Sequence, residues 1–391
     1  MSASFFLPAF GQEDWYDRWV GTNTKNYDQK IFSGFKVEEF VTDLSFPTTM
    51  TFVDNELLIL QKNNGHIIHV DNDGISTSQP ILDLNVTNLY ESGALGIISS
   101  NSDVYVYYTE SNQDGGEPFG NNIYKYQWME NTLQNPRLVK SLPAFPNSLI
   151  HNGGPMVIDN ENTLYAIIGD QHMANGGTIL QNLFEPPNDT GVIVPLESND
   201  GYFAIGIRNS FGLTIDPLTG NMWQTENGPG SYDEINLVYP KFNSGWSAHT
   251  GPISESRIDV LSLPDIFGIW KSHLQLFFSS ILINFYLGES YEYDDPKFSW
   301  KTPVSPTALA FSDSSYGDFK NWLFVGDCNN GNIYKFKLNS DRTSIILQDE
   351  TMKDLVQNES DNNEEIIFGQ GFGCITDIKF KDGVMYVASL T

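Results

Sequence analysis

The feature that most constrains the fold is a turn followed by a strand, repeated six times along the chain. Each copy begins with a polar turn and continues as a short apolar and aromatic run. The copies are NELLILQKNNG from Asn55, SDVYVYYTES from Ser102, NTLYAIIGDQ from Asn162, GNMWQTENGP from Gly220, NWLFVGDCNNG from Asn321 and DGVMYVASLT from Asp382. They lie about 50 to 60 residues apart, with one gap near 100, and such a period with several strands per unit is typical of a β-propeller.

The rest of the chain agrees with an all-β fold. Short β-branched and aromatic runs alternate with Gly, Asn, Asp and Pro turns, and long stretches of helical period are nearly absent. Six copies predict a six-bladed β-propeller. No further strand follows DGVMYVASLT, so we expect a truncated last blade, into which FKVEEFV (35–41) could pair. The segment Ile269–Leu287 breaks the rhythm and is either an inserted hairpin, a helix or a corrupted stretch.

Length and the N-terminal residues suggest the domain division. A chain of 391 residues suits one large or two medium domains. We expect an N-terminal extension over 1–34 and the propeller over 35–391. The opening MSASFFLPAFGQE resembles the end of a secretory signal without its basic region, although an ordinary N-terminus explains it equally well. The first of these readings, with the acidic composition, predicts an extracytoplasmic protein.

Charge and cysteine content exclude several classes of function. The net charge is −28, from 49 acidic against 21 basic residues. Binding to nucleic acid or anionic lipid requires a basic surface, so neither is expected as a partner. No run reaches the roughly 18 apolar residues that a membrane-spanning helix needs. Two cysteines do not make a disulfide scaffold, and no Cys/His metal spacing is present.

Polar residues at the ends of predicted strands are the candidates for chemistry. His151 lies in IHNGGP, Asp170 in IIGDQH, and Arg208 and Asn209 in AIGIRNSFG. A histidine oriented by a carboxylate is a suitable general base, and an arginine can stabilise developing negative charge. The structural alternatives are a core histidine, a turn aspartate and an arginine in a buried ion pair.

These motifs, in their order along the chain, resemble the glucose/sorbosone dehydrogenase family. The resemblance runs from about Phe46 to the C-terminus. It rests on FPTTMTF, ESGALGI, HNGGPMVIDNENTLYAIIGDQ, SPTALAF, WLFVGDCNNGNIYKFKL and above all the series RN, ENGP, DEIN and GW between Arg208 and Trp246. The resemblance implies a soluble aldose dehydrogenase on a six-bladed propeller that uses pyrroloquinoline quinone (PQQ) and calcium.

The resemblance also implies roles for individual residues. His151 corresponds to the base that takes the proton of the sugar's anomeric hydroxyl, Asp170 to the acid that orients it, and Arg208 to the cation beside the quinone. Positions implied to contact the cofactor are Glu91, Asn209, Asn227, Gly228, Pro229 and Asp233. Positions implied to bind calcium are Gly228, Pro229, Glu234 and Ser244, with backbone carbonyls acting at the Gly-Pro pair and at the serine. The implied partners are a sugar and an external electron acceptor.

The chain departs from the family where the cofactor's carboxylates would be neutralised. The family places a lysine and two arginines there, and the corresponding residues are Asn329, Cys374 and Thr376. We therefore expect an intact proton-transfer half and a cofactor-anchoring half without its charges, which Lys62 or Arg208 could replace only in part. Cys328 and Cys374 lie at or beside these positions, and we expect two buried free thiols rather than a disulfide.

Three functions remain open from the sequence. The first is a PQQ-dependent sugar dehydrogenase. The second is a non-catalytic propeller that binds a carbohydrate or a protein, which the missing cations favour. The third is a calcium-dependent lactone hydrolase, which the fold permits but the motifs match less well. The sequence does not indicate the sugar or the oligomeric state.

Overall fold

The structure is a computed structural model that describes residues 29–171, 188–198, 201–246, 249–253 and 291–390. Its strands form six sheets, and each sheet contains one antiparallel hairpin that carries one copy of the repeat. The six hairpins are β2–β3 (Pro47–Val53, Glu56–Gln61), β6–β7 (Ala94–Ser100, Asp103–Glu110), β10–β11 (Met156–Ile158, Leu164–Ile168), β14–β15 (Gly212–Ile215, Met222–Glu226), β20–β21 (Pro306–Phe311, Leu323–Asp327) and β26–β27 (Cys374–Lys381, Val384–Leu390).

The turn of every hairpin contains a residue with left-handed backbone. These residues are Asn55, Asn101, Asn162, Gly220, Asn321 and Asp382, with φ between 52° and 78°. Glycine, asparagine and aspartate adopt this conformation more readily than other residues. The polar turns that opened each copy of the repeat are therefore the positions at which the chain reverses direction, and the predicted rhythm is confirmed.

Further strands extend five of the sheets outward. They are β4 (His66–Val70) and β5 (Leu82–Asp83) in the first sheet; β8 (Gly120–Met129) and β9 (Thr132–Leu142) in the second; β12 (Val192–Pro195), β13 (Ala204–Ile205), β17 (Phe242–Asn243) and β18 (Glu292–Tyr293) in the third; β16 (Asp233–Val238), β19 (Phe298–Trp300) and β24 (Val356–Gln357) in the fourth; and β22 (Ile333–Leu338), β23 (Ile345–Ile346), β25 (Ile367–Gln370) and β1 (Lys30–Ile31) in the fifth. The short 3-10 helices Gly317–Phe319 and Glu350–Met352 lie in connections.

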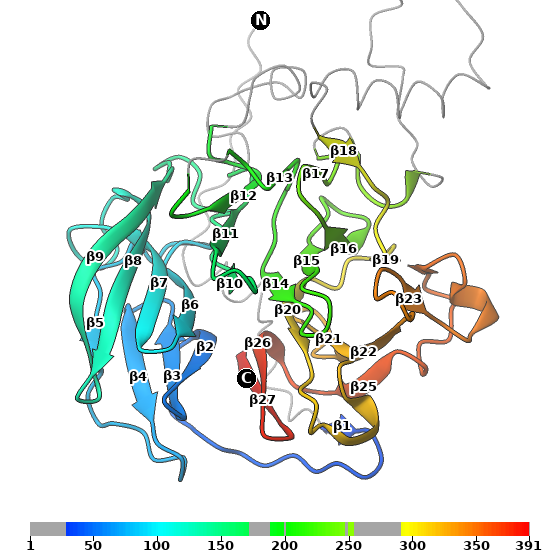
Figure 1. Cartoon of the computed structure of the whole chain (residues 1–391), viewed down its shortest axis with the longest axis horizontal. Helices are drawn as coiled ribbons and strands as arrows, with labels where there is room; N and C mark the ends of the chain where they lie inside the picture. The colour runs from blue at the N-terminus through cyan, green and yellow to red at the C-terminus, as the bar shows by residue number, and fades with distance from the viewer. Residues whose placement is uncertain (1–28, 172–187, 199–200, 247–248, 254–290, 391) are drawn as a thin grey trace, which may run out of the picture.

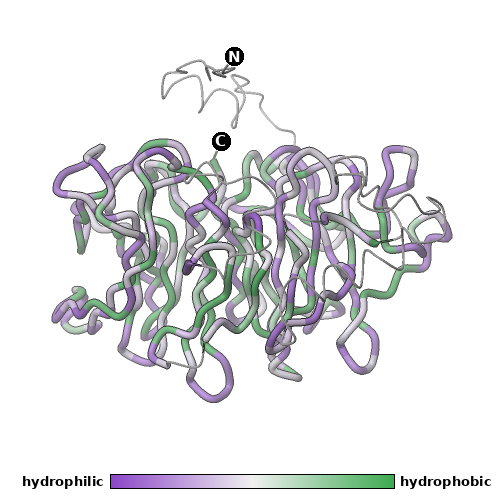
Figure 2. The backbone as a smooth tube through the Cα atoms, turned by 90° about the horizontal axis from the view of Figure 1, so that it is seen from above, coloured by the Kyte–Doolittle hydropathy of each residue, from purple (hydrophilic) through white to green (hydrophobic). Residues whose placement is uncertain are grey.

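The sheets are arranged as a propeller. The first strand of each hairpin lies nearest the centre, and β2, β6, β10, β14, β20 and β26 contact one another in a closed ring (Figure 1). Buried apolar side chains fill the spaces between neighbouring sheets, including Trp223 and Trp300 between the fourth and fifth. Figure 2 shows the strands crossing the thickness of the disc. The sixth sheet has two strands, β26 and β27, so the count of six complete blades stays a prediction.

One buried carboxylate joins the sixth sheet to the first. Asp377 Oδ2 on β26 accepts hydrogen bonds from Thr49 Oγ1 and from Met50 N, both at 2.9 Å. Around it Met50, Ile59 and Ala388 pack as a small apolar cluster. The seam between the ends of the ring is thus held by side-chain packing, by this acid and by a hydrogen bond of 3.1 Å from Lys381 Nζ to the carbonyl of Asn55.

The predicted pairing of FKVEEFV into the last sheet is wrong. Residues 35–41 form no strand, and Phe40 instead packs its ring against Tyr386 of β27, with centroids 5.5 Å apart. Phe35, Val37 and Val41 follow a period of two, but Glu39 interrupts that face and Phe40 lies on the other, so the run does not offer one continuous apolar face as a strand would. Backbone pairing occurs earlier in the chain, where Lys30 and Ile31 lie opposite Gln370 and Gly369 of the fifth sheet.

Two of the regions singled out in the sequence lie outside the described residues: the segment Ile269–Leu287 and the opening 1–28. Within the described ranges, no helix is long and apolar enough to cross a membrane.

Candidate functional site

His151 and Asp170 meet where two strands of the third sheet begin and end. His151 precedes β10, Asp170 follows β11, and His151 Nδ1 lies 2.5 Å from Asp170 Oδ1. The other oxygen of Asp170 accepts a hydrogen bond of 2.6 Å from the indole Nε1 of Trp246. The imidazole is therefore held through Nδ1, and its Nε2 is the nitrogen that could take a proton from a substrate.

The loop before β10 needs its glycines. Gly153 has φ +75°, and a Cβ there would lie 2.1 Å from the carbonyl oxygen of Ile167. His151 itself has φ 58°, a conformation that costs free energy for a residue with a Cβ. The pair of glycines allows the loop to press against β11, and this close approach brings His151 within reach of Asp170.

Glu91 connects this pair to the neighbouring sheets. Its Oε2 accepts a hydrogen bond of 2.5 Å from the backbone N–H of His151 and lies 3.4 Å from Asn209 Nδ2. All three residues are buried. The structure thus brings together Glu91, His151 and Asn209, which the sequence had placed on three separate motifs.

Arg208 lies between the histidine pair and the Gly-Pro loop. Its Nη1 donates to the carbonyl of Asn227 at 2.7 Å, and its guanidinium lies 5.4 Å from the ring centre of Trp246. Its backbone N–H donates to Glu226 Oε1 at 2.6 Å. Trp246 touches both Asp170 and Arg208, yet the sequence assigned it no role. Its only signal there was its place at the end of the GW motif.

Asp233 holds the Gly228–Pro229 loop in place by hydrogen bonds to backbone N–H groups. Its Oδ1 accepts from Gly228 N at 2.8 Å, and its Oδ2 accepts from Val304 N and Ser305 N, both at 2.7 Å. Burial raises the pKa of this carboxyl, while the three backbone N–H groups act in the opposite direction. Asp233 therefore shapes the loop by binding backbone on both of its oxygens.

Two further acids, Glu226 and Glu234, flank the Gly228–Pro229 loop in the sequence and are buried. Glu226 accepts from the hydroxyl of Ser244, and Glu234 accepts from Gly251 N at 2.5 Å and from Asn236 Nδ2 at 3.0 Å. Burial raises the pKa of Glu226 to about 7 and that of Glu234 to about 8, and the charge of Glu226 adds to the second shift. Glu226 was not singled out in the sequence, where it is one acid among 49.

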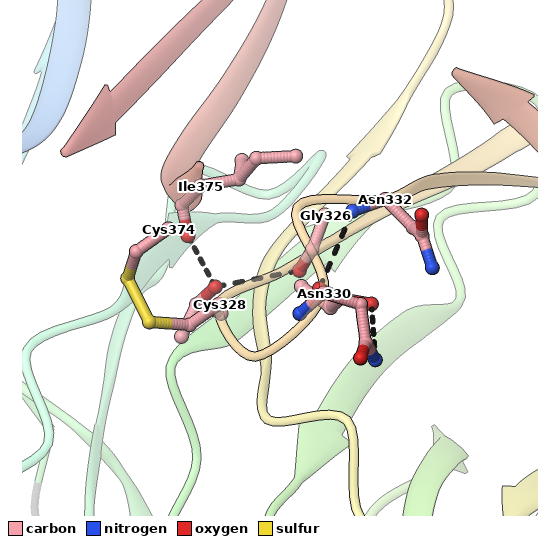
Figure 3. Close-up of a disulfide and its surroundings, with 8 residues drawn as sticks. Gly326, Cys328, Asn330, Asn332, Cys374 and Ile375 are labelled. Carbon is pink, nitrogen blue, oxygen red and sulfur yellow. Dashed lines mark hydrogen bonds between the residues drawn. A yellow bond between two sulfur atoms is a disulfide. The ribbon is translucent and has the colours of Figure 1, made fainter. Parts of the chain in front are cut away.

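The expectation of free thiols is wrong. Cys328 and Cys374 form a disulfide that joins the turn after β21 to the start of β26 (Figure 3). Sequence separates them by 46 residues, and only the packing of the fifth sheet against the sixth brings their Cα atoms together. Asn329 donates to the carbonyl of Pro303 at 3.2 Å, and Thr376 lines the central cavity.

The central cavity has a volume of about 170 Å³ and is lined by residues from all six first strands. Glu91, Cys374, Thr376 and Lys62 are among its lining residues. Lys62 directly follows β3, so it lies at the end of the cavity where β2 and β26 begin. Within the described ranges no three His, Cys, Asp or Glu side chains gather as a metal site.

A family model described as glucose/sorbosone dehydrogenase matches residues 44–256, more than half of the chain. The chain belongs to this family. Among curated relatives, the aldose sugar dehydrogenase YliI of Escherichia coli (strain K12) is 24% identical over 207 residues, which cover 50% of this chain and 49% of that protein. Quinoprotein glucose dehydrogenase B of Acinetobacter calcoaceticus is 24% identical over 267 residues, covering 57% and 53%. The chain thus spans about half the length of the curated relatives it matches.

Solved structures share the fold over most of the chain. The PQQ-bound aldose sugar dehydrogenase from Streptomyces coelicolor is 19% identical with a TM-score of 0.60, and the match covers 92% of this chain and 91% of that one. The soluble aldose sugar dehydrogenase from Escherichia coli in the apo-form is 18% identical with a TM-score of 0.62, covering 92% and 95%. At these identities the likeness establishes the propeller fold.

Buried polar atoms test whether the site fits the family's cofactor. Arg208 Nε, Asn209 Oδ1, Asn227 Oδ1 and Thr376 Oγ1 are buried without a hydrogen-bond partner in the part of the chain that the structure describes. Buried polar groups are normally paired, so these four suit a polar ligand. The side of the site around His151 and Arg208 therefore fits a quinone, while Cys374 and Thr376 of the sixth sheet, which correspond to the family's arginines, carry no charge.

Proposed function

We propose that this oxidoreductase-family chain is a PQQ-dependent aldose dehydrogenase that oxidises the C1 hydroxyl of a sugar. The observation that carries the proposal is the pair formed by buried His151 and half-buried Asp170, which Trp246 links to Arg208. Bound PQQ would supply the acceptor for the hydride that leaves C1. An external acceptor would then reoxidise the enzyme.

His151 would act as the base. Its Nδ1 is held by Asp170, so Nε2 is presented for the proton of the anomeric hydroxyl. Asp170 would stabilise the imidazolium that forms, and the Trp246 indole N–H holds Asp170 in place through its second oxygen. Glu91 positions the histidine by accepting its backbone N–H.

Arg208 would stabilise negative charge that develops on the acceptor side. It is anchored by the carbonyl of Asn227 and lies over the Trp246 ring, while its Nε has no partner among the described residues. A preorganised cation in a buried site needs little reorganisation during the reaction and is worth more there than in water. The amides of Asn209 and Asn227 would bind polar atoms of the cofactor.

Calcium is proposed at the same loop. The carbonyls of Gly228 and Pro229 would provide oxygen ligands to an ion that also contacts the cofactor, which suits a hard cation. Glu234 and the backbone of Ser244 would hold a second, structural ion. In support, Glu226 and Glu234 are both buried acids with raised pKa values, and a cation would relieve their mutual repulsion.

The propeller itself is proposed to have six blades, with β26–β27 as the inner hairpin of the last. We also propose the domain division 1–34 and 35–391, and an extracytoplasmic location. The Cys328–Cys374 disulfide supports this location, because disulfides persist mainly in oxidising compartments.

The second candidate function is a propeller that binds a carbohydrate or a protein without catalysis. One observation favours it: the sixth-sheet side of the cavity offers a disulfide and a threonine where the family has arginines. A trianionic cofactor would then lose charge-assisted contacts worth about 1.5–3 kcal/mol each.

Reconstitution separates the two functions. The protein would be incubated with PQQ and calcium, and dye reduction would be measured with several aldoses. We expect turnover that His151→Gln abolishes while PQQ binding, followed by fluorescence, persists. A matched control is His69→Gln, which changes another buried histidine paired with an acid, Glu56 at 2.6 Å, on an outer strand. Absence of both binding and turnover in the unaltered protein would exclude the enzyme in its PQQ form.

A further inference from the structure

Three candidate site residues are each followed directly by a buried polar residue: Ser92 after Glu91, Asn152 after His151, and Gln171 after Asp170. None of these three followers is more than 1% exposed. Hydrogen bonds join Asn152 to both of the others. One side chain therefore connects the three chain segments that carry the candidate base, its acid partner and Glu91.

The carbonyl of Pro143 determines the direction of the hydrogen bonds in this network. It accepts from Asn121 Nδ2 at 2.7 Å and from Gln171 Nε2 at 2.6 Å. A carbonyl only accepts, so both side-chain amides present their NH2 groups here. Asn152 Oδ1 accepts from the same two groups, at 3.0 Å and 3.4 Å respectively. The Asn152 amide therefore directs its oxygen toward these donors and its nitrogen toward Ser92 Oγ, 3.2 Å away.

The second sheet anchors the network. The Tyr107 hydroxyl on β7 donates to the backbone carbonyl of Asn152 at 2.7 Å, and Thr109 Oγ1 donates to Asn121 Oδ1 at 2.7 Å. These three strand residues are fully buried on β7 and β8, which pair along the whole of β7. The network thus ties the loop that carries His151 to a regular part of the neighbouring sheet.

That loop has little regular backbone structure of its own. Residues 143–155 form no strand, and His151, Gly153 and Gly154 have positive φ. Glu91 and Trp246 each hold the pair through one atom, His151 N and Asp170 Oδ2. The placement of the loop against the end of β11 therefore depends on the side chains that bind it.

Asn152 is the central member of the network. Both polar atoms of its side chain are paired, whereas Gln171 Oε1 is buried without a partner among the described residues. Removing the Asn152 side chain would separate Ser92 from Gln171 and leave Asn121 bound to Pro143 alone. A fully paired buried network holds its members rigidly, and this one adjoins the candidate base.

We propose that Asn152 is a positioning residue, which keeps His151 at hydrogen-bonding distance from Asp170 and in its place beside Glu91. The inference rests on the proposed function in taking this pair as the base and its orienting acid. Asn152 would act through the loop and touch neither sugar nor cofactor. Loss of its side chain should leave binding intact and slow the step in which His151 takes the proton. A misplacement of about 1 Å in a reacting group lowers a rate by up to about 100-fold.

The first measurement follows the hydrogen bond itself and needs neither PQQ nor turnover. A histidine ring N–H that donates to a carboxylate gives a proton NMR signal far downfield of the backbone amides. We expect one such signal from His151, which His151→Gln removes. A second should come from His69, which pairs with Glu56 at 2.6 Å and serves as an internal reference.

Two variants perturb the network to different degrees. Asn152→Ala removes the central side chain, and Tyr107→Phe deletes only the hydroxyl that binds the Asn152 carbonyl. The matched control is Tyr291→Phe, which deletes a hydroxyl that donates to the carbonyl of Tyr202 at 3.0 Å, beside the outermost strand of the third sheet. Melting temperatures would establish that each variant folds.

We expect Asn152→Ala to shift or abolish the His151 signal and to leave the His69 signal in place. With PQQ, calcium and an aldose, its turnover number should fall about 10- to 100-fold, while KM and PQQ affinity change less than about threefold. Tyr107→Phe should act in the same direction with a smaller effect. Tyr291→Phe should match the unaltered protein in every measurement.

The outcomes separate the inference from the proposed function. A changed His151 signal in Asn152→Ala, in a protein without PQQ-dependent turnover, would retain the positioning role and overturn the proposed function. An unchanged His151 signal in folded Asn152→Ala would overturn the inference, as would absence of that signal from the unaltered protein. If Asn152→Ala does not fold, Tyr107→Phe decides in the same way.

Three further results would overturn the inference. The first is an unchanged turnover number in an active protein whose His151 signal has moved. The second is an equal change in the His69 signal, and the third is a loss of PQQ affinity as large as the loss of turnover. The last two would indicate a general distortion of the fold.

Discussion

Replacing Lys62 by methionine should stabilise the ligand-free protein, and the gain should depend on pH. Methionine keeps the apolar stem and removes the ammonium group. Burial lowers the pKa of Lys62 from 10.5 to about 7 in the folded protein, and in the unfolded chain it returns to its ordinary value. Between these values the unfolded chain binds more protons, so the lysine's contribution to the free energy of unfolding rises with pH. Above pH 10.5 the lysine is neutral in both states and does not destabilise the folded protein. As the pH falls toward about 7, the charged lysine becomes increasingly favoured in the unfolded chain, and the folded protein loses stability.

The magnitude follows from the size of the shift. The two pKa values differ by about 3.5 units, and each unit corresponds to about 1.36 kcal/mol, which gives an upper value of about 5 kcal/mol. Side-chain relaxation toward water reduces this. We therefore expect Lys62→Met to be about 2–4 kcal/mol more stable than the unaltered protein at pH 6, and equal to it near pH 10.5.

Urea unfolding at several pH values between 6 and 10.5, without calcium or PQQ, measures the difference. All other titrating groups are shared by the two proteins, so their effects cancel. Lys379→Met, which removes a partly exposed ammonium group from the same central cavity, is the control. A constant difference for Lys62→Met, or a loss of stability at pH 6, would refute the reasoning.

Three further predictions follow from the site and the ring. Changing Cys328 and Cys374 together to serine should lower the free energy of unfolding by about 4 kcal/mol, the chain-entropy value for a loop of 46 residues, and dithiothreitol should have no further effect on that variant in urea unfolding. Trp246→Phe removes the donor to Asp170 but keeps a ring beneath the guanidinium, so the turnover number should fall about tenfold while PQQ affinity changes less than threefold. Removing calcium with a chelator should lower the melting temperature, because an ion bound only to the folded state stabilises it, and Glu234→Gln should remove that response; an unchanged melting temperature in the unaltered protein would contradict the structural ion.

Local chemistry made the fold predictable from sequence. The turn residues Asn55, Asn162 and Asn321 have the left-handed backbone that their type favours, and the apolar runs after them form the second strands of hairpins. The closure of the ring was not predictable in this way. It depends on side-chain contacts between remote segments, and the mistaken pairing of 35–41 shows that an interrupted apolar alternation does not define a strand.

The candidate site was predictable in part for a similar reason. His151 and Asp170 lie at adjacent strand ends of one sheet, so their separation follows from the hairpin register. Trp246 and the disulfide were missed because each joins segments that lie far apart in the sequence. Which distant segments meet depends on the packing of the whole ring, and no local pattern encodes that packing.

The seam at Asp377 and the disulfide have unequal strength, and this has a consequence for how the ring opens. The link between the sixth sheet and the first is non-covalent, whereas the link between the sixth and the fifth is a covalent bond. When the seam at Thr49 and Met50 separates, β26–β27 stays attached to its other neighbour. Reclosing is then an encounter within one tethered molecule, at a high effective concentration, rather than a search by a loose chain end.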